Sequence, residues 1–161
     1  MTSPRIGHGY DVHAFTQGNG FVLGGIKIPC DKSIVAHSDG DVLIHALCDA
    51  LLGALGRGDI GRLFPDSDAL NENRDSREFL QAVKRLADQD GFRLGNADIT
   101  VILQAPKVAP QLEAMQLVLA RALDCPAGLI NIKATTTEKL GFIGREQGVA
   151  VEAVVLLEPV T

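Results

Sequence analysis

The stretch RIGHGYDVHAF, residues 5–15, decides the fold, together with HSDGDVLIHALCDALLG at residues 37–53. Alternate side chains of an extended segment share one face, so Asp11 and His13 point to the same side of the first stretch. The second stretch is typical of a loop that runs into a helix carrying His45. A carboxylate and two imidazoles from two different elements are therefore expected to converge.

Asp11, His13 and His45 are ligands that zinc accepts, and three protein ligands with one open position distinguish a catalytic zinc site from a closed structural one. Spacing alone makes this the minority interpretation, since Asp-x-His is common and a lone helical histidine is more often an ordinary core or surface residue. Cys48, three residues after His45, is a rival ligand on the same helical face. Asp49 is either a carboxylate that fixes the His45 ring or part of a solvated acidic stripe.

The 161 residues are predicted to form one domain, residues 1–161, without linker, internal repeat or low-complexity tract. Apolar residues make up 46% of the chain and aromatic residues only 4%, so the core must be aliphatic. The formal charge of −5 and the pI near 5.3 argue against nucleic acid or an anionic membrane surface as a partner. A phosphate ligand would therefore need cations supplied locally.

The cysteine pattern and the lack of targeting signals favour a soluble protein of a reducing compartment. Cys30, Cys48 and Cys125 are odd in number and include no C-x-x-C pair, which argues against a disulfide framework. The N-terminal residues MTSPRIG contain no apolar leader, and no run of eighteen apolar residues occurs. We expect a cytoplasmic protein, although a plastid stromal protein without its transit peptide would have the same features.

Hydrophobic spacing and turn residues predict six strands and three helices. Strands are expected at residues 4–9, 21–23, 26–28, 97–104, 130–134 and 149–157, the second and third forming either a hairpin or one bent strand. Helices are expected after a cap at Ser38 or Asp39, from an Asp75 cap to Gly91, and at residues 111–123. The helix that begins at Asp75 is interpreted as scaffold.

Two glycine-containing loops invite functional interpretations. Residues 56–61 spell G-R-G-D-I-G, but this segment follows a helix, whereas a dinucleotide fingerprint must follow a strand, so we reject a Rossmann site. Residues 135–145, TTTEKLGFIGR, group hydroxyls, a carboxylate and cations beside glycines, a composition that suits phosphate contacts. Polar composition alone favours an ordinary surface loop there.

The predicted fold class is α/β (α+β), a single small domain with a mixed β-sheet. In the strands at residues 97–104 and 149–157, apolar residues occupy both odd-numbered and even-numbered positions. Both faces of each strand therefore need cover. Three helices can cover only one face of a small sheet. A second copy of the chain is the simplest cover for the other face.

Four blocks of sequence, in this order, resemble the 2-C-methyl-D-erythritol 2,4-cyclodiphosphate synthase family of the non-mevalonate isoprenoid pathway. The blocks are GHGYDVHAF, AHSDGDVLIHALCDALLGALGRGDIGRLFPD, ADITVILQAPK and IKATTTEKLGFIGR, and the resemblance runs from about Arg5 to Leu157. It implies a homotrimer whose sheets face the threefold axis and whose active sites lie between subunits. Departures are Val108 and Ala109, smaller than is usual, and Tyr10, where phenylalanine is frequent.

The resemblance also implies roles for individual residues. Asp11, His13 and His45 would hold one zinc ion per subunit, in preference to Cys48, and Glu138 would hold a second divalent cation, magnesium or manganese. His37 and Thr136 would act in catalysis, contacting the phosphates with Ser38. The implied substrate contacts are Asp11, Val12, His13, His37, Ser38, Asp59, Ile60, Gly61, Phe64, Pro65, Asp66, Ser67, Asp68, Leu103, Gln104, Ala105, Pro106, Lys107, Val108, Ala109, Thr135, Thr136, Thr137, Glu138, Phe142 and Arg145.

Within that set, Asp59 and Gly61 would lie near the ribose, residues 64–68 would close over the erythritol part, and residues 103–109 of a neighbouring subunit would hold the cytidine. Phe142 and Arg145 would border the axial cavity, where an isoprenoid diphosphate is a further implied partner.

The implied reaction is the cyclisation of 4-diphosphocytidyl-2-C-methyl-D-erythritol 2-phosphate. The 2-phosphate attacks the β-phosphorus and CMP leaves, so one anion must approach another. Two divalent cations would neutralise that charge, and no protein nucleophile is required. Two other classes fit the same residues: a zinc phosphohydrolase that uses metal-bound water, and a non-catalytic trimer that binds isoprenoid diphosphates through Arg145 without needing His45.

Overall fold

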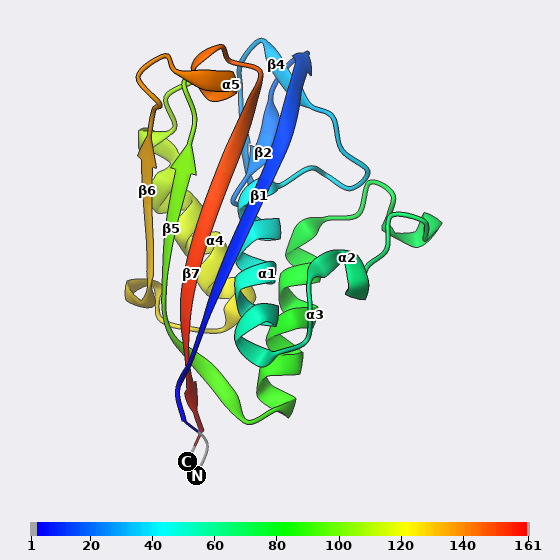
Figure 1. Ribbon diagram of the computed structural model, residues 1–161, viewed down its shortest axis with the longest axis vertical. Helices are drawn as coiled ribbons and strands as arrows, with labels where there is room; N and C mark the ends of the chain where they lie inside the picture. Colours follow the sequence, from blue (N-terminus) through cyan, green and yellow to red (C-terminus); the bar gives the residue numbers. More distant parts are fainter. Residues whose placement is uncertain (1–2, 161) are drawn as a thin grey trace.

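The computed structural model describes residues 3–160, in which a layer of helices packs on a twisted sheet (Figure 1). The five-stranded sheet has the order β4-β1-β7-β5-β6, and a separate hairpin pairs β2 with β3. The strands are β1 Arg5–Gln17, β2 Phe21–Leu23, β3 Ile26–Ile28, β4 Lys32–Ile34, β5 Phe92–Ile102, β6 Ile130–Thr135 and β7 Gly148–Pro159. The helices are α1 Val42–Leu55, α2 Ile60–Leu63, α3 Ser76–Gln89, α4 Leu112–Leu123 and α5 Gly141–Gly144. Met1, Thr2 and Thr161, the ends of the predicted domain, lie outside the described residues.

The large sheet is mixed, as predicted. β1 runs antiparallel to β7 from the Arg5–Leu157 pair to the Ala14–Gly148 pair, β7 runs antiparallel to β5, and β6 is parallel to β5. β1 is much longer than the strand predicted at residues 4–9, because its pairing with β7 continues through residue 14. Asp11 and His13 therefore lie inside a paired strand, which fixes the direction of their side chains.

The helices α1, α3 and α4 all lie on one side of the large sheet, which confirms the predicted layer arrangement (Figure 1). The core between the layers is aliphatic, as the composition required, and its fully buried side chains include Leu43, Leu47, Leu51, Leu119 and Ile99. Within residues 3–160, no helix has the length and apolar character needed to cross a membrane.

The opposite face of the sheet is open in the single chain. Its exposed apolar side chains are Ile6, Tyr10, Val12 and Val154. The prediction that the strands at residues 97–104 and 149–157 have no polar face is only partly right. Glu152 is exposed there between apolar neighbours, and Lys133 of β6 donates a hydrogen bond to Asp98 of β5 at 2.6 Å.

Two glycines of β1 allow α1 to approach the sheet closely. A Cβ atom at Gly7 would lie 1.8 Å from the carbonyl oxygen of Ala50, and one at Gly9 would lie 1.9 Å from that of Ala46. Both distances are impossible for real atoms, so no larger residue fits while α1 keeps its place. The glycines share the helix-facing side of β1 with Asp11 and His13, so the close approach brings the next turn of α1 to these ligands.

The beginning of α1 differs from the prediction. Its cap is Asp41 and neither Ser38 nor Asp39, because the Asp41 carboxylate accepts a hydrogen bond from the N–H of Ile44 at 3.1 Å. The same carboxylate, which is completely buried, accepts from the N–H groups of Gly24 and Gly25 in the β2–β3 turn. The predicted Asp75 cap of α3 is confirmed. The short helices α2 and α5 were not predicted.

Candidate metal centre

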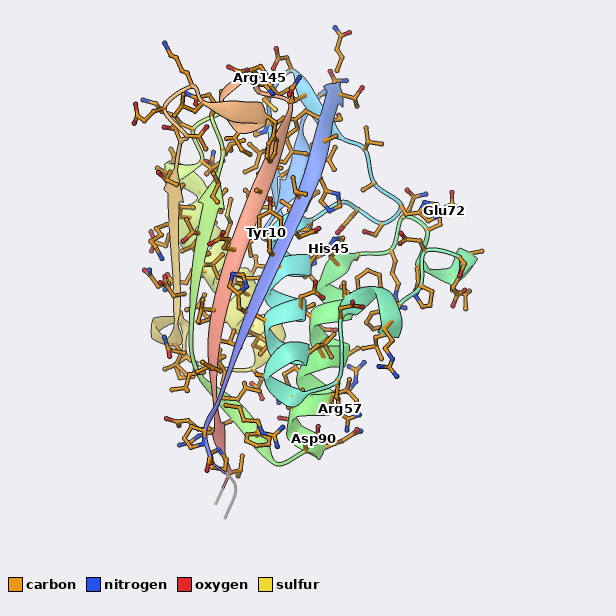
Figure 2. All side chains as sticks on the ribbon, in the orientation of Figure 1. Tyr10, His45, Arg57, Glu72, Asp90 and Arg145 are labelled. Carbon is orange, nitrogen blue, oxygen red and sulfur yellow. The ribbon has the colours of Figure 1, made fainter. Side chains whose placement is uncertain are left out.

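Asp11, His13 and His45 each bring one potential ligand atom to a common point between β1 and α1. Asp11 Oδ2 lies 3.0 Å from His13 Nε2 and 3.2 Å from His45 Nδ1, and the two nitrogens are 3.3 Å apart. Ligand atoms of a tetrahedral zinc site, with bonds of 2.0–2.1 Å, lie about 3.3 Å from one another. The triangle therefore has the size that such an ion needs, and Figure 2 shows His45 extending from α1 towards β1.

The electrostatics of the centre are those of a buried carboxylate between two imidazoles. Burial by itself would raise the pKa of Asp11, but hydrogen bonds from His13 and His45, together with their positive charge when protonated, lower it from 3.8 to about 2. Burial would lower the pKa of His45, yet the hydrogen bond and charge of Asp11 raise it above 6.5. Without a cation, the carboxylate is thus held ionised beside an imidazole that retains a proton readily.

The two residues near His45 whose roles the sequence left open, Cys48 and Asp49, both lie outside the metal triangle. Cys48 is completely buried outside the triangle, and burial raises its thiol pKa well above 9.0, which disfavours the thiolate that binds metals. Asp49 does not hydrogen bond with His45. Its carboxylate instead accepts from the N–H of Ile60 at 2.7 Å, so it orders the loop after α1.

Of the residues predicted to contact phosphates, His37 and Ser38 lie beside the centre, whereas Thr136 does not. Ser38 lies in the loop before α1, with its Oγ 3.2 Å from His45 Nε2, and His37 is exposed next to it. Val12 points to the opposite face of β1, so its side chain faces away from the metal centre. Thr136 is exposed beyond the end of β6 and does not lie at the triangle.

The predicted ribose and erythritol loop lies beside the same centre, at the right of Figure 2 near Glu72. Asp59 caps α2, accepting from the N–H of Arg62 at 2.9 Å. Phe64 packs on Phe79 with ring centroids 4.5 Å apart, and Phe79 in turn lies 6.3 Å from the His45 ring. The remaining predicted contacts of this loop are exposed: Gly61, Pro65, Asp66, Ser67 and Asp68.

The predicted cytidine residues, except Ala105, line a separate cavity of about 220 Å³ at the ends of β5 and β6. Its lining consists of Leu103, Gln104, Pro106, Lys107, Val108, Ala109, Ala134, Thr135 and Thr136. None of these residues lies in the metal triangle, and β7 separates β5 from β1 in the sheet. Within one chain, the predicted metal ligands therefore lie together and the predicted cytidine residues lie together, but the two groups are separate.

The TTTEKLGFIGR segment, residues 135–145, lies at one end of the sheet and includes α5, and most of its residues are exposed (Figure 1). Thr136 Oγ1 accepts a hydrogen bond from the N–H of Glu138 at 3.2 Å, and both Glu138 and Lys139 have positive φ angles. The N–H of Lys139 donates to Gln104 at 3.1 Å, which ties this loop to the cavity. Arg145 and Phe142 are exposed, and Arg145 is labelled at the top of Figure 2.

A model of the YgbB family matches residues 4–158 of the sequence. The chain belongs to this family. A relative from Thioalkalivibrio sulfidiphilus, named 2-C-methyl-D-erythritol 2,4-cyclodiphosphate synthase, is 58% identical over 98% of this chain and 99% of its own. A solved IspF–CDP complex from Plasmodium falciparum has a TM-score of 0.89 and 35% identity, covering 100% of this chain and 99% of its own. The bifunctional IspDF of Campylobacter jejuni has a TM-score of 0.94 and 46% identity, covering 98% of this chain, which spans 42% of that longer one.

The sequence interpretation missed two residues next to the centre of this YgbB family member. Ser76, the first residue of the helix interpreted as scaffold, lies with its Oγ 2.9 Å from His45 Nε2. Asp39, interpreted only as a possible helix cap, hydrogen bonds with Ser76 through both its carboxylate oxygens. No local pattern marks either residue, because each contact joins segments that are more than thirty residues apart.

Proposed function

We propose that this chain is a 2-C-methyl-D-erythritol 2,4-cyclodiphosphate synthase. It converts 4-diphosphocytidyl-2-C-methyl-D-erythritol 2-phosphate to the 2,4-cyclic diphosphate and releases CMP. The observation that supports this most strongly is the Asp11, His13 and His45 triangle, in a chain that is 58% identical to a relative bearing that enzyme's name. The similar Plasmodium falciparum structure is a complex with CDP, which supports a cytidine nucleotide as the ligand class.

The protein residues contribute binding, orientation and charge. Asp11, His13 and His45 would hold a zinc ion, which supplies positive charge to the phosphates. Ser38 and His37, on the loop before α1, would orient the attacking 2-phosphate, and Thr136 would contact the diphosphate. The net charge of −5 otherwise repels such an anionic substrate, so these local contacts must overcome that repulsion. Positioning and electrostatic stabilisation suffice for phosphoryl transfer of this kind.

Glu138 would hold a second divalent cation, magnesium or manganese, at the diphosphate. Its carboxylate is exposed in a loop of hydroxyls and cations next to the proposed cytidine cavity. A carboxylate beside phosphates is repelled unless a cation stands between them, which is why we assign Glu138 to a metal.

The bacterial sources of curated relatives are compatible with a cytoplasmic enzyme that acts as one domain over residues 1–161.

We also propose that the enzyme is a homotrimer with active sites between subunits. The metal triangle and the cavity at residues 103–109 are separate in one chain, which supports a site whose cavity is supplied by a neighbouring copy. The open sheet face with Ile6, Tyr10 and Val154 is the surface that such copies would cover. An isoprenoid diphosphate held near Phe142 and Arg145 is the further partner we propose for the axial cavity.

The activity is tested by incubating the protein with the cytidine diphosphate substrate and following the products by phosphorus NMR. The proposal expects CMP and the cyclic diphosphate, and expects neither with His45→Ala. A zinc phosphohydrolase would instead release an acyclic product that incorporates oxygen from labelled water. A non-catalytic binder of isoprenoid diphosphates would give no product and would keep its binding in His45→Ala while losing it in Arg145→Ala.

The trimer is tested by light scattering on the purified chain and on Val154→Glu. The wild type is expected at three times the chain mass, and Val154→Glu is expected to dissociate because it would bury charge in the interface. Leu117→Glu, which adds the same charge at a similarly exposed apolar residue of α4, is the matched control and should remain a trimer. A monodisperse monomer at micromolar concentration would contradict both the trimer and the shared active site.

A further inference from the structure

The Nε2 atom of His45, on the side of the ring away from the metal triangle, lies near two serine hydroxyls. Ser76 Oγ is 2.9 Å from it and Ser38 Oγ is 3.2 Å from it. Ser76 is completely buried at the start of α3, whereas Ser38 is partly exposed in the loop before α1. Of these two hydroxyls, only that of Ser76 also hydrogen bonds with a carboxylate, namely that of Asp39.

We propose that Asp39 and Ser76 are positioning residues that fix the tautomer and the ring orientation of His45. In this arrangement, the Asp39 carboxylate orders the Ser76 hydroxyl, and the hydroxyl orders the imidazole so that Nδ1 faces the metal. The inference rests on the metal centre proposed above and deepens it. It assigns a functional role to the start of α3.

The direction of each hydrogen bond follows from counting donors. Asp39 accepts from the N–H of Asp41 at 3.1 Å, from the N–H of Ser76 at 2.9 Å and from the Ser76 hydroxyl. An ionised carboxylate only accepts, so the single hydrogen of the Ser76 hydroxyl is committed to Asp39. The hydroxyl can then only accept from His45, and the hydrogen of the neutral imidazole must therefore be on Nε2.

A hydrogen on Nε2 leaves the lone pair of the neutral ring on Nδ1. Nδ1 is the atom of His45 that lies 3.2 Å from Asp11 and 3.3 Å from His13, at the corner of the metal triangle. The tautomer imposed by Ser76 is thus the one that can bind a cation there. Metal-binding histidines are commonly held in this way through their second ring nitrogen, most often by a carboxylate or carbonyl directly.

The arrangement also leaves Ser38 free for other contacts. Because Ser76 already accepts from His45 Nε2, the Ser38 hydroxyl is not needed to hold the ring and can turn to a phosphate oxygen. The loop that carries Ser38 is fixed to the segment before α3 by two backbone hydrogen bonds, from Asp39 N–H to Arg74 at 3.2 Å and from Asn73 N–H to His37 at 2.9 Å. Asp39 therefore connects the proposed phosphate loop to the metal ligand.

The first test measures zinc affinity by competition with a chromogenic chelator for the wild type and for Ser76→Ala, Asp39→Ala, Ser38→Ala and Asp75→Ala. The proposal expects Ser76→Ala and Asp39→Ala to weaken zinc binding by roughly 10- to 100-fold. Ser38→Ala should bind within about threefold of the wild type. Asp75→Ala, which removes the α3 cap but touches no part of His45, is the matched control for simple damage to the helix and should also bind within about threefold.

Zinc binding by Ser76→Ala that equals the wild type would overturn the proposal, as would an equal loss in Asp75→Ala. A wild type that binds no zinc would instead refute the proposed metal centre, so the two failures are distinguishable. Where a variant does not fold, nitrogen-15 NMR of the zinc-loaded wild type still decides. The proposal expects a proton on His45 Nε2, and a proton on Nδ1 would overturn it.

Discussion

The Asp49 carboxylate accepts a hydrogen bond from the backbone N–H of Ile60 at 2.7 Å. This bond joins the exposed side of α1 to the first residue of α2, the proposed ribose and erythritol loop. It also explains why an acidic residue follows His45 by one helical turn without contacting it. Burial, reinforced by the nearby carboxylates of Asp59 and Asp11, raises the pKa of Asp49, and the hydrogen bond from Ile60 opposes that rise.

Asp49→Ala is expected to leave zinc affinity within about threefold of the wild type, because no bond to His45 is lost. It should raise the KM for the cytidine diphosphate substrate several-fold, since an unpaired Ile60 N–H loosens the loop by about 1 kcal/mol. Steady-state kinetics and chelator competition measure the two effects. Asp49→Asn, which keeps an acceptor oxygen, should restore most of the KM. A tenfold or greater loss of zinc in Asp49→Ala would reinstate the sequence-based expectation that Asp49 orders the His45 ring.

Gly9→Ala is expected to destabilise the protein by roughly 1–3 kcal/mol and to weaken zinc binding as well. The new Cβ would lie 1.9 Å from the Ala46 carbonyl oxygen, so α1 must move away from β1 and carry His45 with it. Urea denaturation measures the free energy of unfolding. Gly128→Ala is the matched control, because nothing lies within 4 Å of its Cβ position. Equal stability of the two variants would show that α1 does not pack as closely as described.

The metal-free protein is expected to owe part of its stability to the Asp11–His45 pair in a defined pH window. The Asp11 pKa is lowered to about 2, so its contribution is present above pH 3.8 and is lost as pH falls from 3.8 through 2. The His45 pKa is raised, so its contribution is present below pH 6.5 and is lost as pH rises through the raised value.

This pH dependence is measured as the free energy of unfolding in urea with a chelator present, for the wild type and Asp11→Asn. The difference between them should be greatest between about pH 4 and 6.5 and should decline on both sides. Asp11→Asn serves as the control because it removes the pair while leaving all other titrating groups in place. A difference that does not vary from pH 2 to pH 9 would show that the pair contributes nothing.

Glu138→Gln is expected to retain zinc and the oligomeric state but to lose most activity at limiting magnesium, with partial recovery when magnesium or manganese is added. The reason is that the amide is a poor ligand for a hard cation at the diphosphate. Kinetics over a magnesium titration measure this, with Glu113→Gln as the control. If Glu138 is only an exposed neighbour of Lys139, worth well under ~1 kcal/mol, turnover at limiting magnesium will be normal and the second metal site will be refuted.

Much of the active-site proposal was accessible from the sequence because the relevant chemistry is local. The alternation along residues 5–15 placed Asp11 and His13 on one face, and helical spacing placed His45 near the start of α1; the structure brings all three together. The residues that the family resemblance assigns to the cytidine pocket, apart from Ala105, line one cavity. The mixed sheet with helices on one face followed from counting apolar strands and amphipathic helices.

Side-chain periodicity thus predicted the three main helices and every strand except β4, and it placed the potential metal ligands on their faces, whereas the family resemblance selected those residues as a ligand set. Only the tertiary structure decided which polar groups meet across segments. Asp41 caps α1 because it also reaches the β2–β3 turn, Asp49 bonds with Ile60, and Ser76 reaches His45 from the start of α3. These contacts depend on how closely α1 approaches β1 at Gly7 and Gly9, a distance that no periodicity encodes.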